Sequence, residues 1–122
     1  MHLLYVDDDR INLMLFEIAC AALPGLQLAT ASSGAEALEL VRDRAPQLLV
    51  IDLHLPDMLG YALLPQLRQQ LAAPALPAYL CTADAADQVA GPARAAGFDG
   101  CWPKPVPATT LRSELARRSA AA

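Results

Sequence analysis

Short apolar runs alternate with longer amphipathic stretches along this chain. The run at 48–51 is apolar at every position, which is typical of a strand buried on both faces. The longer stretches carry apolar residues at helical spacing, as at Leu13, Phe16, Ile18 and Cys20. The pattern predicts strands at 3–6, 26–31, 48–51, 78–81 and 100–102, and helices at 11–23, 35–45, 61–71, 88–96 and 108–118.

Turn-forming residues separate these elements, as at Pro24-Gly25, the cap at 32–34, and the loop at 56–60. Strict alternation of strand and helix implies a parallel sheet covered by helices on both faces. We therefore expect an α/β fold of (βα)5 type. It would be a doubly wound parallel five-stranded sheet in the order 2-1-3-4-5, a flavodoxin-like three-layer sandwich. One domain would fill 1–122, with a core at about 2–118 and a tail at 119–122.

Composition narrows the functional classes. Hydrophobic residues make up 55% of the chain, which is enough for a packed core. The net charge is −4 and no basic stripe is present, which argues against direct nucleic-acid binding. No apolar stretch reaches the ~18 residues of a membrane span. The cysteines Cys20, Cys81 and Cys101 are odd in number and lack C-x-x-C spacing, so we expect a reduced, cytoplasmic setting.

Polar residues gather where the predicted strands end. Asp7 and Asp8 follow the first strand, and Asp52 follows the third. Thr82 follows the fourth strand, and Lys104 comes shortly after the fifth. In doubly wound sheets, ligands bind beyond the carboxyl ends of the strands, at the point where the strand order reverses. We expect these five side chains to meet in one pocket there.

Three carboxylates in one pocket repel each other unless a cation neutralises them. Mg²⁺ takes oxygen ligands and is the expected ion, with Mn²⁺ as an alternative. A metal also removes the repulsion between a carboxylate nucleophile and an anionic phosphate. Asp52 is therefore the predicted phosphoacceptor, and Lys104 and Thr82 are the predicted contacts to the phosphoryl oxygens.

Several stretches carry a resemblance to a known family. They are 6–9, 51–60, Thr82-Ala83, 97–100 and Lys104-Pro105, in this order. Together they resemble the receiver domain of bacterial two-component response regulators, of the chemotaxis-regulator type, over essentially the whole chain. The surroundings of Asp99 and Trp102 look more like receivers of hybrid sensor kinases.

The resemblance implies a role for each matching residue. Asp52 would accept a phosphoryl group from a histidine kinase or a histidine phosphotransfer protein. Asp8, Asp52 and the main-chain carbonyl of His54 would bind the metal directly, and Asp7 would act through metal-bound water. Lys104 would precede a cis peptide bond. Such a domain catalyses only its own phosphorylation and dephosphorylation, so we expect a signalling domain in a phosphorelay and not an enzyme.

The chain departs from the family pattern on the face that usually signals. Cys101 stands at the usual position of an aromatic switch residue, with Trp102 beside it, and Pro103 replaces a Thr or Ser. The fourth helix contains Gly91-Pro92, and a proline inside a helix costs about 3 kcal/mol. The switch candidates are Thr82, Cys101 and Trp102.

Other interpretations remain open. A phosphatase of the haloacid-dehalogenase class also uses a strand-end Asp and Mg²⁺, but it needs a second Asp where this chain has His54. A flavodoxin-like or Rossmann cofactor module needs a glycine-rich loop after the first strand, where this chain has Asp7-Asp8-Asp9. A pseudo-receiver would act only by protein binding.

Two further aspartates are expected to have structural roles: Asp9 to cap a helix and Asp57 to serve in a turn. The kinase, the signal, the output and any larger parent protein stay open.

Overall fold

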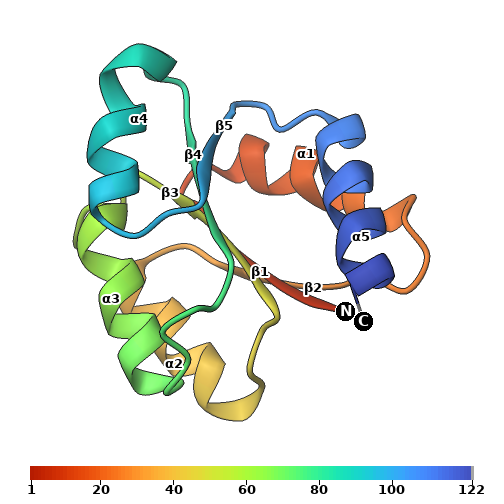
Figure 1. Cartoon of the computed structure of the whole chain (residues 1–122), viewed down its shortest axis with the longest axis horizontal. Coiled ribbons are helices and arrows are strands. Elements are labelled where there is room, and N and C mark those ends of the chain that lie inside the picture. Colours follow the sequence, from red (N-terminus) through yellow and green to blue (C-terminus); the bar gives the residue numbers. More distant parts are fainter. Residues whose placement is uncertain (122) are drawn as a thin grey trace.

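The computed structural model describes residues 1–121 and forms a parallel five-stranded sheet in the order β2-β1-β3-β4-β5 (Figure 1). Fold class and strand order are as predicted. The strands are β1 (His2–Val6), β2 (Gln27–Ala31), β3 (Leu48–Asp52), β4 (Ala78–Thr82) and β5 (Gly100–Pro103). The helices are α1 (Arg10–Ala21), α2 (Gly34–Asp43), α3 (Gly60–Gln70), α4 (Ala86–Ala95) and α5 (Ala108–Ala121).

Helices cover both faces of the sheet (Figure 1). On one face, Leu4 and Ile51 belong to a core cluster with side chains of α2, α3 and α4. On the other face, Leu3 and Tyr5 belong to a cluster with side chains of α1 and α5. Successive residues of a strand point to opposite faces, so each strand supplies both clusters. The result is a three-layer sandwich with β1 and β3 in its interior.

Several boundaries differ from the sequence-based prediction. Helix α1 ends at Ala21 and not at residue 23. Ile18, counted among the apolar residues of helical spacing, is 66% exposed. Helix α4 begins two residues earlier than predicted, and α5 continues through Ala121, beyond the predicted end at residue 118. Residues 119–121 thus belong to a helix where a tail was predicted, and Ala122 lies outside the described residues.

Two prolines lie inside helices, Pro65 in α3 and Pro92 in α4. Each removes one helical N–H and so leaves a carbonyl one turn earlier without its usual partner. Both prolines are exposed, which places them on the solvent side of their helices. The Gly91-Pro92 pair therefore weakens α4 without interrupting it.

The first prediction concerns Gly91. Apart from its chain neighbours and the nearby backbone of its own helix, a Cβ added there meets no heavy atom within 4 Å, and the residue is exposed within α4. Gly91→Ala should raise the free energy of unfolding by less than about 1 kcal/mol, because alanine loses less backbone entropy than glycine in a helix while the ring of Pro92 crowds a Cβ on the residue before it. Urea unfolding followed by circular dichroism measures this change. A lower free energy of unfolding in the variant would show that crowding by Pro92 outweighs the gain in backbone entropy.

Candidate functional site

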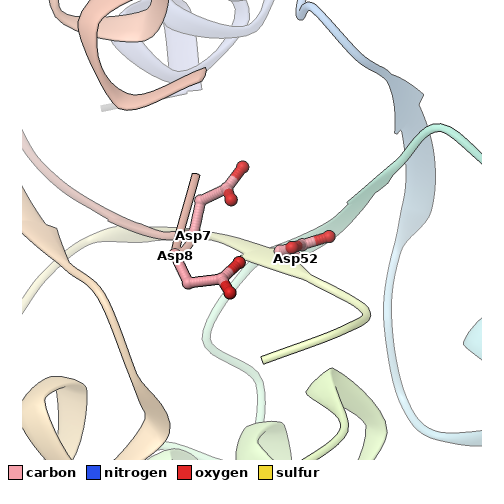
Figure 2. Close-up of side chains that lie close together, drawn as sticks. All are labelled: Asp7, Asp8 and Asp52. Atoms are coloured by element: carbon pink, nitrogen blue, oxygen red, sulfur yellow. The ribbon is translucent and has the colours of Figure 1, made fainter. Parts of the chain in front are cut away.

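The acidic residues predicted from the sequence meet at the carboxyl ends of β1 and β3 (Figure 2). The two strands are neighbours, with Val6 paired to Ile51, so the residues that follow lie side by side. Asp7, Asp8 and Asp52 each offer an oxygen that lies within 4.8 Å of the others. Asp7 and Asp52 are buried, whereas Asp8 is exposed. Hence two of the carboxylates are held inside the protein, and one faces solvent.

Lys104 joins the two buried carboxylates. Its Nζ lies 2.9 Å from Asp7 Oδ2 and 2.9 Å from Asp52 Oδ1, and its side chain is 11% exposed. Burial alone lowers the pKa of Lys104, but the hydrogen bonds to Asp52 and Asp7 outweigh it, so the pKa lies above its ordinary value. The ammonium therefore stays charged. The Lys104-Pro105 peptide bond is cis, as the family resemblance implied.

Asp52 ends β3 and is 4% exposed. Burial raises the pKa of its carboxyl above the ordinary value, and the charge of Asp7 adds to this effect. The hydrogen bond from Lys104 and one from the main-chain N–H of His54 act in the opposite direction. Burial thus makes the ionised form of Asp52 costly, and the ammonium of Lys104 offsets part of that cost.

Tyr5, which the sequence analysis did not single out, also belongs to this site. Its hydroxyl donates a hydrogen bond to Asp7 Oδ2 at 2.6 Å, and the main-chain N–H of Asp9 donates to Asp7 Oδ1 at 2.9 Å. Burial raises the pKa of Tyr5, so the hydroxyl keeps its proton and remains a donor. Strand periodicity could have indicated this contact, because residues 5 and 7, in β1 and directly after it, point to the same face of the sheet.

Thr82 ends β4 and is 4% exposed; its Oγ1 accepts a hydrogen bond from the N–H of Asp84 at 3.1 Å. Beside it lies a pocket of about 310 Å³ between the end of β4, α4 and β5. Lys104 lies at this pocket too. The residues lining the pocket are Thr82, Ala83, Asp84, Val89, Cys101, Trp102, Pro103 and Lys104.

The two other switch candidates face opposite sides of the sheet. Cys101 is partly exposed and packs against the core cluster of α2, α3 and α4. Trp102 is 8% exposed and belongs to the cluster of α1 and α5, where its ring stacks on Tyr79 with 4.4 Å between ring centroids. A large movement of Trp102 would therefore break a stacked pair inside the core.

The loop between β3 and α3 is tied to its neighbours. Asp57, expected to serve only in a turn, accepts hydrogen bonds from the N–H groups of Gly34 and Ala35, both at 2.9 Å. These bonds lower its pKa and hold the loop against the first turn of α2. A Cβ at Gly60 would lie 2.5 Å from the carbonyl oxygen of Asp52. Only glycine fits there, so Gly60 allows the loop to return closely to the main chain of Asp52.

His54 lies in the same loop, and its Nε2 is 3.1 Å from Asp84 Oδ2 in the loop after β4. Both side chains are largely exposed. The interaction joins the two loops that flank Asp52 and Thr82. The side chain of His54 is therefore occupied at the surface, and the predicted metal ligand is the main-chain carbonyl of this residue. Asp9 is the helix cap that we expected, since its side chain accepts hydrogen bonds from Ile11 and Asn12.

Comparisons with known proteins agree with this architecture. A family model described as the response regulator receiver domain matches residues 3–116. The virulence sensor protein BvgS of Bordetella pertussis is 36% identical over 120 residues, which cover 94% of this chain and 10% of that protein. The sensor histidine kinase RcsC of Salmonella typhimurium is 34% identical over 116 residues, covering 95% of this chain and 12% of that protein. The chain thus spans about a tenth of the length of these relatives.

A solved structure of a putative response regulator from Chloroflexus aurantiacus superposes with a TM-score of 0.83 at 29% identity and covers 93% of each chain. The likeness extends over nearly the whole sheet and its helices. Within residues 1–121, none of the helices has the length and apolar character needed to cross a membrane.

The second prediction follows from the position of Lys104. Lys104→Ala should bind Mg²⁺ severalfold more tightly than the unmodified protein, because the variant frees two carboxylates from a competing cation. Even at the dielectric constant of water, a unit charge about 4 Å away contributes about 1 kcal/mol. Isothermal titration calorimetry gives both dissociation constants. Weaker Mg²⁺ binding in Lys104→Ala would contradict the charge balance described above.

Proposed function

The chain belongs to the response regulator receiver domain family of two-component systems, and from that premise we propose that it accepts a phosphoryl group on Asp52 with the help of Mg²⁺. The observation that carries the proposal is the cluster of Asp7, Asp8 and Asp52 with Lys104 between the two buried carboxylates. A surface that only binds other proteins does not need two buried carboxylates and a buried ammonium beside an exposed third carboxylate.

The residues present fit a magnesium ion. All three side chains offer oxygen donors, the ligand type that Mg²⁺ prefers, and their oxygens lie close enough to serve one ion. Asp8 and Asp52, with the main-chain carbonyl of His54, would bind the ion directly, and Asp7 would act through a bound water. When bound, Mg²⁺ neutralises negative charge on the carboxylates and on the incoming phosphoryl oxygens. Mn²⁺ offers the same chemistry.

The chemistry of the chain itself is nucleophilic. An oxygen of Asp52 forms the new P–O bond while the P–N bond of a phosphohistidine breaks and its electron pair stays on the ring nitrogen. The other ring nitrogen carries a proton taken from water, so the histidine leaves as a neutral imidazole. Lys104, now paired with Asp52 Oδ1, is placed to bind a phosphoryl oxygen on that carboxylate. Thr82 offers a hydroxyl at the end of the neighbouring strand. Such a domain catalyses only its own phosphorylation and dephosphorylation.

The third prediction tests the acceptor. Incubation with acetyl phosphate and Mg²⁺ should add the mass of one phosphoryl group to the unmodified protein. Asp52→Asn should add none, because an amide oxygen is a poor nucleophile and cannot form the acyl phosphate. Intact-mass spectrometry, with a chelator in a parallel reaction, measures both effects. Labelling of Asp52→Asn to the same extent would place the acceptor elsewhere, and labelling in the presence of chelator would remove the metal from the proposal.

An apolar stripe on α1 supports a protein as the phosphoryl donor. Four large side chains of this helix lie three or four residues apart, so they share one face. They remain between 44% and 68% exposed, which is unusual for a contiguous apolar stripe. They are Ile11, Met14, Leu15 and Ile18. Since α1 begins directly after the acidic residues, a donor seated on this stripe would reach Asp52. A histidine kinase or a histidine phosphotransfer protein is the proposed donor, which is consistent with the similarity to RcsC, a sensor histidine kinase.

The fourth prediction separates docking from chemistry. Met14→Ser combined with Ile18→Ser should slow phosphoryl transfer from a phosphorylated histidine phosphotransfer domain by about tenfold or more, because two apolar contacts worth about 1.4 kcal/mol together are lost. Labelling by acetyl phosphate should be unchanged, since neither side chain touches the acidic cluster. Gln69→Ser, at an exposed position of α3, is the matched control. Unchanged transfer from a donor domain that phosphorylates the unmodified protein would rule out α1 as the docking surface.

For the output we propose a route through the loop after β4 and through α4. Thr82 would move toward the phosphoryl group, while Cys101 is too small to change the surface by reorienting. The Gly91-Pro92 pair lowers the stability of α4, so a shift of this helix would cost only a few kcal/mol.

Two alternative functions are less well supported. A haloacid-dehalogenase-type phosphatase lacks its second Asp at residue 54, and a pseudo-receiver would not label with acetyl phosphate.

A further inference from the structure

Tyr5 forms a buried contact with the acidic cluster that the proposed chemistry does not use. The residue lies in the middle of β1, between β2 and β3, and is 1% exposed. Its ring stacks on Phe16 of α1, with 4.0 Å between centroids and 9° between planes. The ring is therefore held in the core, stacked on Phe16, and the hydroxyl that it carries points to Asp7.

That hydroxyl and Lys104 share one oxygen atom. Asp7 Oδ2 accepts from the Tyr5 hydroxyl at 2.6 Å and lies 2.9 Å from Lys104 Nζ. Asp7 Oδ1 accepts from the N–H of Asp9. Both oxygens of a fully buried carboxylate are thus held by donors that come from three different elements or loops. Of these donors, only the Tyr5 hydroxyl is carried by an aromatic ring that is stacked in the core.

We propose that Tyr5 is a positioning residue for the metal site, acting through Asp7. It holds the carboxylate in place when Lys104 leaves Asp7, either toward a phosphoryl group or away from a bound cation. Without the hydroxyl, Asp7 would follow Lys104 or rotate, and the oxygen that serves the cation would lose its fixed place. This inference rests on the proposed function, because it requires that Asp7 contributes to Mg²⁺ binding.

The fifth prediction is a double-mutant cycle on Mg²⁺ binding. Loss of an outer hydrogen-bond partner of a metal ligand weakens metal binding by about 10–100-fold. Asp7 would act through a bound water and keeps two other donors, so we expect Tyr5→Phe to weaken Mg²⁺ binding by less than this range, about severalfold. In an Asp7→Ala background, the same substitution should leave the dissociation constant unchanged. Calorimetric titration with MgCl₂ alone measures all four proteins, and thermal unfolding is recorded beside it.

Tyr79 offers a matched control. It too is a buried tyrosine stacked on an aromatic ring, Trp102, and its hydroxyl donates to a carboxylate, Glu114, at 3.0 Å. Tyr79→Phe should lower the unfolding temperature about as much as Tyr5→Phe and leave Mg²⁺ binding unchanged.

The outcomes separate the two proposals. No Mg²⁺ binding by the unmodified protein would overturn the proposed function, and the role of Tyr5 with it. Mg²⁺ binding that is equal in the unmodified protein and in Tyr5→Phe would overturn the role of Tyr5 alone. The same holds if Tyr5→Phe weakens binding equally with and without Asp7, since the effect would then come from the packing of β1. A severalfold loss that disappears in the Asp7→Ala background supports the proposal.

Discussion

The structure depends on the pairing of buried carboxylates with an ammonium group at the carboxyl ends of β1 and β3. Asp7 and Asp52 are both buried, and two such charges side by side in a protein interior are costly unless they are paired. Lys104 supplies the pairing from the position directly after β5, on the far side of β4. The parallel order of the sheet brings these three side chains to one edge, where each lowers the cost of burying the others.

The loops around this cluster are fixed by polar contacts and not by apolar packing alone. Asp57 ties the loop after β3 to the first turn of α2, and Gly60 lets the chain approach the main chain of Asp52. His54 joins this loop to the one after β4 through Asp84. The exposed apolar stripe lies on α1, the helix that begins three residues after Asp7. Asp52, the proposed acceptor, thus lies beside loops held by polar contacts, and the helix that follows the acidic residues offers a surface suited to a protein partner.

The fold and the members of the cluster were predictable because both follow from periodicity. Uniformly apolar runs identify buried strands, and the residues that directly follow such strands converge in a parallel sheet, which was enough to group Asp7, Asp8, Asp52, Thr82 and Lys104. Contacts that cross between elements were not predictable. The partners of Asp57 lie more than 20 residues away in sequence, and nothing local distinguishes Ile18, which is exposed, from Phe16, which is buried. Tyr5 looked like an ordinary strand residue because its ring does pack in the core, and only its hydroxyl reaches the site.

The central claim is that Lys104 balances Asp7 and Asp52 until a phosphoryl group arrives on Asp52. A crystal structure of the protein with MgCl₂ and beryllofluoride, a stable mimic of the phosphoryl group, tests it most directly. The account predicts beryllofluoride bonded to a carboxylate oxygen of Asp52, with Lys104 Nζ in contact with a fluorine and a cation held by Asp8 and Asp52. Beryllofluoride on another residue, or a Lys104 ammonium that still bridges Asp7 and Asp52 beside the bound mimic, would contradict the account.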